Sequence, residues 1–327
     1  MDIIQVKDLS RSFSYYKKEP GLKNSVKNVF HRKKLVKDAV KSISFDISEG
    51  EMVGFLGPNG AGKTTTLKML SGILFPTSGK ASVLGYTPWE RKKEFKKQIA
   101  IVMGQKSQLL WDLPANESLL LNRYIYELSE KQYQATLDEL TELLDIKPLL
   151  GVQVRRLSLG ERMKLELITA LIHKPKVMFL DEPTIGLDLI SQKKIQDFLK
   201  YYNEQSKTTV LLTSHYMSDI ENLCRRAILI NQGELKYDGE LSGVNELFSD
   251  RKRVKLVLGE PVQREEIEPF GKIMAFDGYS TQIEVSRRVL KSTLAHILET
   301  LPVVDFNIED VPIEEGILRL YQKESRA

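Results

Sequence analysis

A run of nine residues near the start of the chain has the composition and spacing of a phosphate-binding loop. Residues 57–65 read G-P-N-G-A-G-K-T-T, which fits the pattern G-x-x-x-x-G-K-[ST]. The mostly apolar residues 51–56 predict a strand before it, and residues 66–70 begin a helical pattern after it. Such a loop wraps backbone N–H groups around a phosphate, and the helix dipole adds to the attraction. A chance glycine-rich turn is the alternative, and the flanking strand and helix argue against it.

The polar side chains of this loop suit a nucleoside triphosphate. Lys63 would place its ammonium group on the β- and γ-phosphates, and the hydroxyl of Thr64 would reach Mg²⁺. We expect the loop to contact the nucleotide through Asn59, Gly60, Ala61, Gly62, Lys63, Thr64 and Thr65.

Two acidic residues follow a second buried strand. Asp181 and Glu182 come after four consecutive apolar residues, 177–180, which are typical of a strand covered on both faces of a parallel sheet. In such a site the aspartate holds Mg²⁺, and the next acid orients and deprotonates the attacking water. His215 follows another such strand, 209–213, so it would lie at the same edge and contact the γ-phosphate. A solvated strand end and a satisfied loop histidine are the alternatives.

The elements that must position these residues alternate between strands and helices. This alternation argues for a doubly wound α/β core, and residues 250–327 form a small separate α+β domain in this interpretation. Ser129 and Gln132 make a capping box at the start of one helix. The predicted strands of the core are 3–9, 40–47, 51–56, 81–84, 99–103, 177–180 and 209–213, and the predicted helical regions are 115–150, 160–173 and 189–206.

The length, composition and cysteine content limit the possible classes of protein. A chain of 327 residues can hold about two domains, and its 42% hydrophobic and 28% charged residues are ordinary for a globular protein. No apolar run approaches the roughly 20 residues of a membrane-spanning helix, and the N-terminus is not a secretion signal. A single cysteine, Cys224, excludes a disulfide framework and suits a reducing cytoplasm. We therefore expect any membrane role to come through a partner.

The net charge of +4 is unevenly distributed. Residues 17–41 contain nine Lys or Arg and two acids, so the rest of the chain is mildly acidic, which argues against a general nucleic-acid binder. We interpret residues 15–41 as a basic insertion and expect an amphipathic helix at an anionic membrane surface. Packing on the rest of the protein and docking on membrane-protein partners are the alternatives. One helical face of the insertion carries Leu22, Val26, Val29 and Phe30.

A second anion-binding segment is predicted where a serine and a glycine precede a helix, in the run L-S-L-G-E-R at 157–162. With this segment the chain resembles the ATP-binding subunit of an ABC transporter over residues 1 to about 245. The closer resemblance is to ABC-2-type exporters, and within these to a viologen or multidrug exporter-like subgroup with a similar basic insertion and the run M-G-Q-K-x-Q-L-x-W-D-L-P. The motifs that carry the resemblance, in chain order, are 57–65, Gln105, 158–161, 177–182, Gly186-Leu187-Asp188 and His215.

The resemblance implies a domain organisation and a set of partners. The ATPase cassette would span 1–245, with a helical subdomain at about 105–173, and 250–327 would be an accessory domain. Two cassettes, either two copies or one copy and a paralogous ATPase, would pair head to tail on ATP and Mg²⁺. They would drive ABC-2-type permease subunits at the cytoplasmic face of the cell membrane. These membrane subunits select the transported substrate in the family, so the sequence of this chain does not name it.

The resemblance also implies roles for individual residues. Ser158, Gly160 and Glu161 of one cassette would contact the nucleotide bound by the other, and Asp188 would lie at the dimer interface. Gln105 would touch Mg²⁺ and the attacking water, so it joins Glu182 and His215 as a catalytic residue, and Thr64 and Asp181 as a metal-site residue. Phe13 would stack on adenine, with Tyr15 or Tyr16 as alternatives. The chain departs from the family pattern at Leu159, Glu161 and Ile185-Gly186, and none of these departures removes a catalytic group.

Two other functions compete with the exporter ATPase. A soluble ABC ATPase acting on nucleic acid or ribosomes is supported only by the basic insertion, because the chain has no long coiled coil, zinc module or second cassette. A phosphate-loop kinase has no use for the segment at 158–161. We also expect residues 105–113 to seat a cytoplasmic helix of the membrane partner through Trp111 and Leu113, with burial of Trp111 in the core as the alternative.

Overall fold

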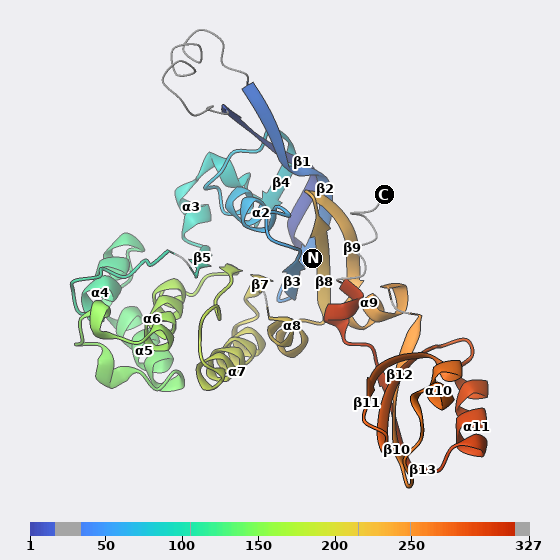
Figure 1. Cartoon of the computed structure of the whole chain (residues 1–327). Helices are drawn as coiled ribbons and strands as arrows, with labels where there is room; N and C mark the ends of the chain where they lie inside the picture. The colour runs from blue at the N-terminus through green and yellow to red at the C-terminus, as the bar shows by residue number, and fades with distance from the viewer. Residues whose placement is uncertain (17–33, 105, 215, 249, 318–327) are drawn as a thin grey trace, which may run out of the picture. The chain divides into compact units, whose positions relative to one another are not determined.

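The computed structural model describes residues 1–16, 34–104, 106–214, 216–248 and 250–317 (Figure 1). The chain forms two compact units, Met1–Asp238 and Gly239–Ala327. Gln105, His215 and residues 17–33, which hold the predicted amphipathic helix, lie outside the described residues. None of the described helices is both long and apolar enough to cross a membrane.

A six-stranded sheet forms the centre of the first unit. Its strand order is β5-β6-β7-β3-β8-β9, and the pairs from β5 to β8 are parallel. Every residue of β3 and β7 is buried, as expected for central strands that are covered on both faces. The predicted α/β core is therefore confirmed. The strands are β3 (Met52–Leu56), β5 (Ile99–Met103), β6 (Val177–Asp181), β7 (Thr209–Thr213), β8 (Arg226–Asn231) and β9 (Glu234–Glu240).

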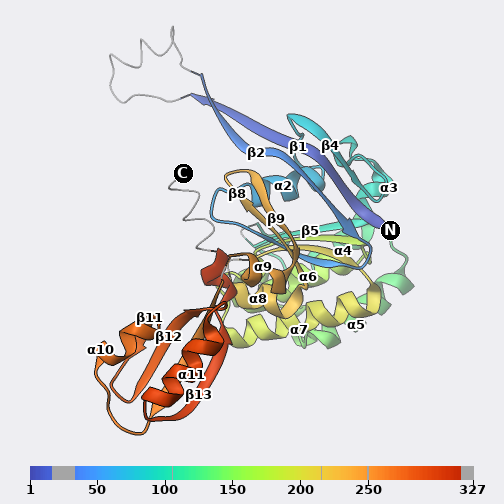
Figure 2. The same ribbon diagram turned by 90° about the vertical axis from the view of Figure 1, so that its right-hand side faces the viewer.

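Helices and short 3₁₀ turns surround this sheet (Figures 1 and 2). The predicted capping box is confirmed, because Ser129 and Gln132 exchange side-chain and backbone hydrogen bonds at the start of α5. A second capping box, between Ser158 and Glu161, begins α6. The helices are α2 (Lys63–Leu70), α3 (Lys93–Lys96), α4 (Ala115–Ile125), α5 (Glu130–Leu143), α6 (Leu159–Leu171), α7 (Leu189–Ser206) and α8 (Met217–Leu223), with 3₁₀ turns at η1 (Pro88–Glu90), η2 (Lys147–Leu149) and η3 (Val154–Arg156).

A three-stranded antiparallel sheet of order β2-β1-β4 completes the first unit. Its strands are β1 (Asp2–Tyr16), β2 (Lys34–Ser48) and β4 (Ser78–Val83). Residues 34–41, which we assigned to the insertion, are part of β2, and β1 extends to Tyr16, which pairs with Lys34. The predicted strands 3–9 and 40–47 were therefore too short. The outer part of this hairpin is largely exposed, so its sequence lacks the apolar alternation that marks a half-buried strand.

The described part of the second unit contains a four-stranded antiparallel sheet of order β11-β12-β10-β13, with helices α10 and α11 between its strands and helix α9 before them. The chain order β-α-β-β-α-β with this strand order is the ferredoxin-like arrangement. Val254, Leu256, Ile283 and Ile297 lie in its buried core. The predicted α+β class is confirmed. The elements are α9 (Leu241–Phe248), β10 (Arg251–Leu258), α10 (Arg264–Ile267), η4 (Glu268–Phe270), β11 (Lys272–Phe276), β12 (Ser280–Ser286), α11 (Leu290–Thr300) and β13 (Val303–Asp310).

Candidate nucleotide-binding site

The phosphate loop connects β3 to α2, as the sequence predicts. The N-cap of α2 is Gly62, with φ of 112°, and no side chain caps the first N–H groups of the helix. A Cβ atom at Gly62 would lie 2.4 Å from the carbonyl oxygen of Ala39, so both the backbone angle and the space require glycine. The first turn of α2 also contains no acidic residue. These uncapped N–H groups form a site for an anionic group such as a phosphate.

The ammonium group of Lys63 points into this loop. Lys63 is buried, and its Nζ donates hydrogen bonds to the carbonyl oxygens of Gly57 at 2.6 Å and Pro58 at 3.3 Å. Burial lowers the pKa of Lys63, and the negative charges of Glu182 and Asp181 oppose this shift. The cation therefore lies where a phosphate cradled by the loop would meet it.

The carboxylate of Asp181 links the end of β6 to both neighbouring elements. Its Oδ2 accepts a hydrogen bond from Thr64 Oγ1 at 2.8 Å, and its Oδ1 accepts one from Thr213 Oγ1, also at 2.8 Å. Carboxylate and hydroxyl oxygens are ligands that Mg²⁺ prefers. The donor set formed by Thr64 and Asp181 therefore fits the magnesium ion that the sequence predicts.

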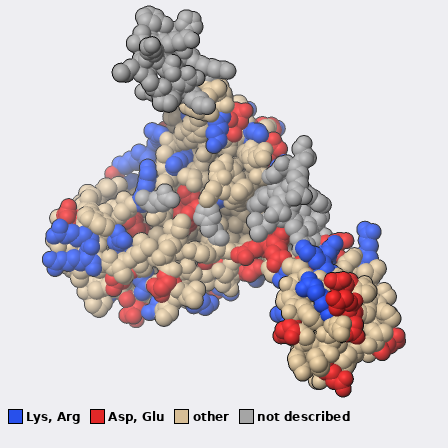
Figure 3. Space-filling model, viewed as in Figure 1, with Lys and Arg blue, Asp and Glu red and all other residues tan. Residues whose placement is uncertain are grey.

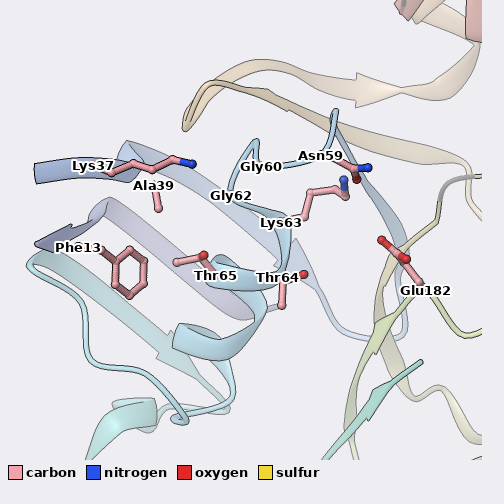
Figure 4. Close-up of a pocket in the computed structure, with 10 residues that line it drawn as sticks. All are labelled: Phe13, Lys37, Ala39, Asn59, Gly60, Gly62, Lys63, Thr64, Thr65 and Glu182. Carbon is pink, nitrogen blue, oxygen red and sulfur yellow. The ribbon is translucent and has the colours of Figure 1, made fainter. Parts of the chain in front are cut away.

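A pocket extends from the phosphate loop along the antiparallel sheet (Figure 4). Figure 4 shows Phe13, from β1, at one end of the pocket and Glu182, which follows β6, at the other. The described residues that line the pocket include Phe13 but neither Tyr15 nor Tyr16. The full lining is Phe13, Lys37, Ala39, Asn59, Gly60, Gly62, Lys63, Thr64, Thr65 and Glu182.

Two of these lining residues were not predicted. Lys37 is paired with Phe13 across β1 and β2, and Ala39 lies two residues further along the same strand. Both fall in the segment that we interpreted as an insertion. The pairing of Phe13 with Lys37 brings them to the pocket, and no local sequence signal indicates a pairing between residues so far apart in the chain.

The backbone at Glu182 directs the chain out of the sheet. Its φ is 58°, in the left-handed region, and its N–H donates to the carbonyl and hydroxyl oxygens of Thr213, both at 3.1 Å. Non-glycine residues in this region cost conformational energy and are concentrated at functional sites. The turn places the carboxylate of Glu182 in the pocket, on the side where Lys63 lies (Figure 4).

Two predicted site residues, Gln105 and His215, lie outside the described residues. Described residues close to each of them in the sequence, Gly104 and Thr213, contact Asp181. The N–H of Gly104 donates to the carbonyl oxygen of Asp181 at 2.9 Å, and Thr213 is the register partner of Asp181 in β7.

The second predicted anion-binding segment belongs to a different place in the unit. Ser158 caps α6, and its Oγ accepts a hydrogen bond from the N–H of Glu161 at 3.3 Å. A Cβ atom at Gly160 would lie 2.6 Å from Ser191 Oγ on α7, so the segment lies against the start of that helix. Asp188 caps α7 and accepts hydrogen bonds from Ser191, which lower the pKa of Asp188. None of these residues lines the described pocket around Lys63.

A group of exposed apolar side chains lies between Gln105 and α4. Trp111 is 50% exposed and Leu113 is 43% exposed, so the alternative that Trp111 is buried in the core is wrong. The guanidinium group of Arg162 lies over the Trp111 ring, 5.0 Å from its centroid. Leu110 is also exposed, so three apolar side chains are presented here around the exposed Asp112, which forms an ion pair with Arg155.

Two family models match the chain. The model described as ABC transporter matches residues 40–185, and the model described as EvrA-like ABC transporter, C-terminal domain, matches residues 250–309. The first match contains the phosphate loop, the segment at 158–161 and the acidic end of β6. The second match covers most of the described second unit.

Similar curated proteins span most of the first unit. The ABC transporter ATP-binding protein NatA of Bacillus subtilis (strain 168) is 35% identical over 217 residues, which cover 66% of this chain and 88% of NatA. The Nod factor export ATP-binding protein I of Burkholderia pseudomallei (strain 1710b) is 34% identical over 240 residues, 73% of this chain and 78% of that protein. A solved structure of the ATP binding subunit of an ABC transporter aligns with a TM-score of 0.61 at 27% identity. The alignment covers 75% of this chain and 93% of the chain in that structure.

Proposed function

The chain belongs to the ATP-binding proteins of ABC transporters, and we propose that it works as one half of a head-to-tail pair of ATPase cassettes. It is the ATP-binding and ATP-hydrolysing subunit of an exporter, and it uses ATP with Mg²⁺. One observation carries the proposed pairing. Ser158, Gly160 and Glu161 do not line the pocket around Lys63, although the family's site needs both groups.

Within one cassette, the described residues divide the tasks of binding and hydrolysis. Phe13 stacks on the adenine, and the uncapped N–H groups of α2 with Lys63 hold the phosphates. Thr64 and Asp181 hold Mg²⁺, which neutralises charge on the β- and γ-phosphates when bound. Glu182 orients the attacking water and takes its proton. Gln105 and His215 are proposed to contact the water and the γ-phosphate.

The second cassette, a copy of this chain or a paralogous ATPase, completes the site. Ser158 and Gly160 at the N-terminus of α6 approach the γ-phosphate bound by the partner, because a helix N-terminus favours an anion. Asp188 lies at the interface, and through Ser191 it is close to Gly160, one of the signature residues Ser158, Gly160 and Glu161. Hydrolysis therefore requires residues from two chains.

A mixing experiment tests this arrangement. Lys63→Ala protein and Ser158→Arg protein should each be inactive, because one loses the phosphate contact and the other the residue that acts on the partner. In a mixed dimer, one composite site contains both defects and the other contains neither. We expect ATPase activity to recover on mixing. If activity does not recover although cross-linking shows mixed dimers, head-to-tail pairing is wrong.

We further propose that the membrane partner docks on residues 110–113. The exposed apolar side chains there, with Trp111 at their centre, support a seat for a cytoplasmic helix of an ABC-2-type permease. This docking would hold the chain at the cytoplasmic face of the cell membrane. Trp111→Ala should reduce co-purification with the permease and reduce export. Its melting temperature should change little, because half of the side chain is already exposed. Normal assembly and export by a folded variant would contradict the proposal.

Among the exporters, we propose that the chain belongs to a viologen or multidrug exporter-like subgroup. The basic stretch at 17–41 and the M-G-Q-K-x-Q-L-x-W-D-L-P run support this subgroup. Relatives at similar identity include proteins for export of Nod factor and transport of bacitracin, so the cassette sequence does not separate these substrates. Identifying the co-purifying permease and measuring methyl viologen sensitivity of cells that lack it would test the proposal; unchanged sensitivity would reject it.

A further inference from the structure

A buried carboxylate joins the helix that carries the signature residues to the segment that follows Gln105. Glu166 lies on α6 and is 6% exposed. Its Oε1 accepts hydrogen bonds from the hydroxyl of Ser107 and, at 2.9 Å, from the N–H of Gln108. The same N–H lies 3.1 Å from Oε2. One side chain of α6 therefore holds two consecutive residues of the segment.

The segment is built around this contact. The hydroxyl of Ser107 also accepts a hydrogen bond from the N–H of Leu109 at 3.1 Å, and the side chain of Gln108 donates to the carbonyl oxygen of Ile101 in β5 at 2.9 Å. Burial raises the pKa of Glu166, and the hydrogen bonds from Ser107 and Gln108 oppose this rise. A buried acid of this kind costs desolvation energy that an apolar side chain would not, and such groups fix one geometry when their hydrogen bonds are made.

A second contact lies one helical turn earlier. Arg162 stacks on Trp111, and residues four apart lie on the same face of a helix, so Arg162 and Glu166 hold both ends of the stretch 107–111. The same helix begins at Ser158. Residues 107–111 are therefore in direct contact with the helix whose N-terminus carries the signature residues.

We infer that Glu166 is a positioning residue that couples the partner-docking segment to the signature end of α6. The inference rests on the proposed head-to-tail pairing. When the membrane partner shifts residues 107–113, Glu166 and Arg162 carry α6 with them, and Ser158 moves relative to the nucleotide of the other cassette. Glu166 itself touches no reacting atom. Its effect should therefore appear in the site of the other chain and not in its own pocket.

Three variants isolate this contact. Glu166→Ala removes both acceptor oxygens, Ser107→Ala removes one donor from the opposite side, and Glu166→Gln keeps the volume and one acceptor oxygen. Since misplacement of a catalytic group by about 1 Å can cost 10²-fold, we expect Glu166→Ala to lower kcat by roughly 10- to 100-fold. The Kd of the isolated protein for ATP should stay unchanged, and Ser107→Ala and Glu166→Gln should give smaller losses of kcat. An unchanged kcat in all three variants would overturn the inference.

A mixing experiment shows whether Glu166 acts on the site of its own chain or of the partner. A general loss of stability would not produce such a pattern. Glu166→Ala protein should recover activity when mixed with Lys63→Ala protein, because one composite site is then intact. It should not recover with Ser158→Arg protein, because both signature segments are then defective. The reverse pattern would place the effect in the pocket of the same chain and overturn the inference. If Glu166→Ala does not fold, Ser107→Ala and Glu166→Gln are mixed in the same way, with the same two readings.

The mixture of Lys63→Ala and Ser158→Arg proteins is the control. If this control fails to recover, the proposed pairing is wrong and the inference falls with it. If the control recovers and Glu166→Ala does not recover with Lys63→Ala, the pairing holds and only the role of Glu166 is rejected.

Discussion

At the scale of residues, the site depends on charges held in a buried setting by backbone geometry. Lys63 comes from a glycine loop, and Asp181 and Glu182 come from the end of a strand that the sequence marks by its apolar residues. The sequence predicted that these residues meet at one edge of the sheet, and in the structure Lys63 and Glu182 line the same pocket while Asp181 bonds Thr64. Asp219 was not predicted. It is 1% exposed and accepts hydrogen bonds from the nearby Ser214 and from Thr184 and Gln196, which are distant in the sequence.

His173 gives a pH-dependent contribution to stability. Its ring stacks on Tyr126 with centroids 3.7 Å apart, its Nε2 lies 3.0 Å from the carbonyl oxygen of Ile99, and burial lowers the pKa of His173 to about 4. The pKa of His173 is lower in the folded protein than its unfolded value of about 6.5, so protonation of the ring favours the unfolded chain. The contribution of neutral His173 to the free energy of unfolding is therefore complete above about pH 6.5 and is lost as the pH falls toward 4.

We expect titration of His173 to lower the free energy of unfolding by about 1–2 kcal/mol when the pH is lowered from about 7 to about 5. Urea unfolding of the wild type and of His173→Gln at both pH values measures it, since the variant removes this titration and keeps a polar side chain. Equal losses in the two proteins would show that His173 does not contribute.

At the scale of elements, burial decides what the sequence reveals. The predicted bounds of α7 and β7 match the structure because each has a strong periodic or continuous apolar pattern next to polar residues. The outer hairpin of β1 and β2 lacks such a pattern because it is exposed, and we mistook part of it for an insertion. This error concealed Lys37, whose place in the pocket depends on cross-strand register.

The capping box of α6 places an acid where the family has glutamine. The carboxylate of Glu161 accepts a hydrogen bond from the N–H of Ser158 at 2.8 Å. In the proposed pair this negative charge approaches the triphosphate of the other cassette. Glutamine keeps the capping bond without the charge, because both side chains serve in capping boxes.

Glu161→Gln should therefore lower the ATP concentration needed for dimer formation by roughly fivefold, which corresponds to about 1 kcal/mol for one like charge near the site. Sedimentation velocity across an ATP titration, in a background that does not hydrolyse ATP, measures this shift. The melting temperature is the control for the cap. An unchanged or higher ATP requirement would mean that Glu161 does not face the nucleotide.

At the scale of the whole molecule, the fold class was predictable from the sequence, but the partners were not. Motif order indicated the family, and the loose pattern after Asp238 indicated a second unit. Figure 3 shows Lys and Arg side chains interspersed with Asp and Glu over the described surface in that view. The basic run at 17–41 is a feature of the sequence. Its role depends on a surface outside this chain, which the sequence cannot specify.

For this run we keep the proposal of an anionic membrane surface. Each basic residue near such a surface contributes about 1 kcal/mol. Reversing the charge of Lys23, Lys27, Lys33 and Lys34 together should abolish binding to vesicles that contain anionic lipid, with neutral vesicles as the control. Lost assembly with the permease but unchanged vesicle binding would indicate docking on the partner instead. If neither changes, the run is a solvated loop.

The central claim is that Glu182 is the general base of an ATPase that closes as a pair. Glu182→Gln keeps the shape of the side chain and removes the base, so we expect ATP turnover to fall by about 10²–10⁴-fold while ATP binding is kept. The direct measurement is ATP hydrolysis together with sedimentation of the variant in ATP and Mg²⁺. The account predicts negligible hydrolysis and a dimer that accumulates only with ATP. Hydrolysis near the wild-type rate, or a variant that stays monomeric in saturating ATP, would contradict it.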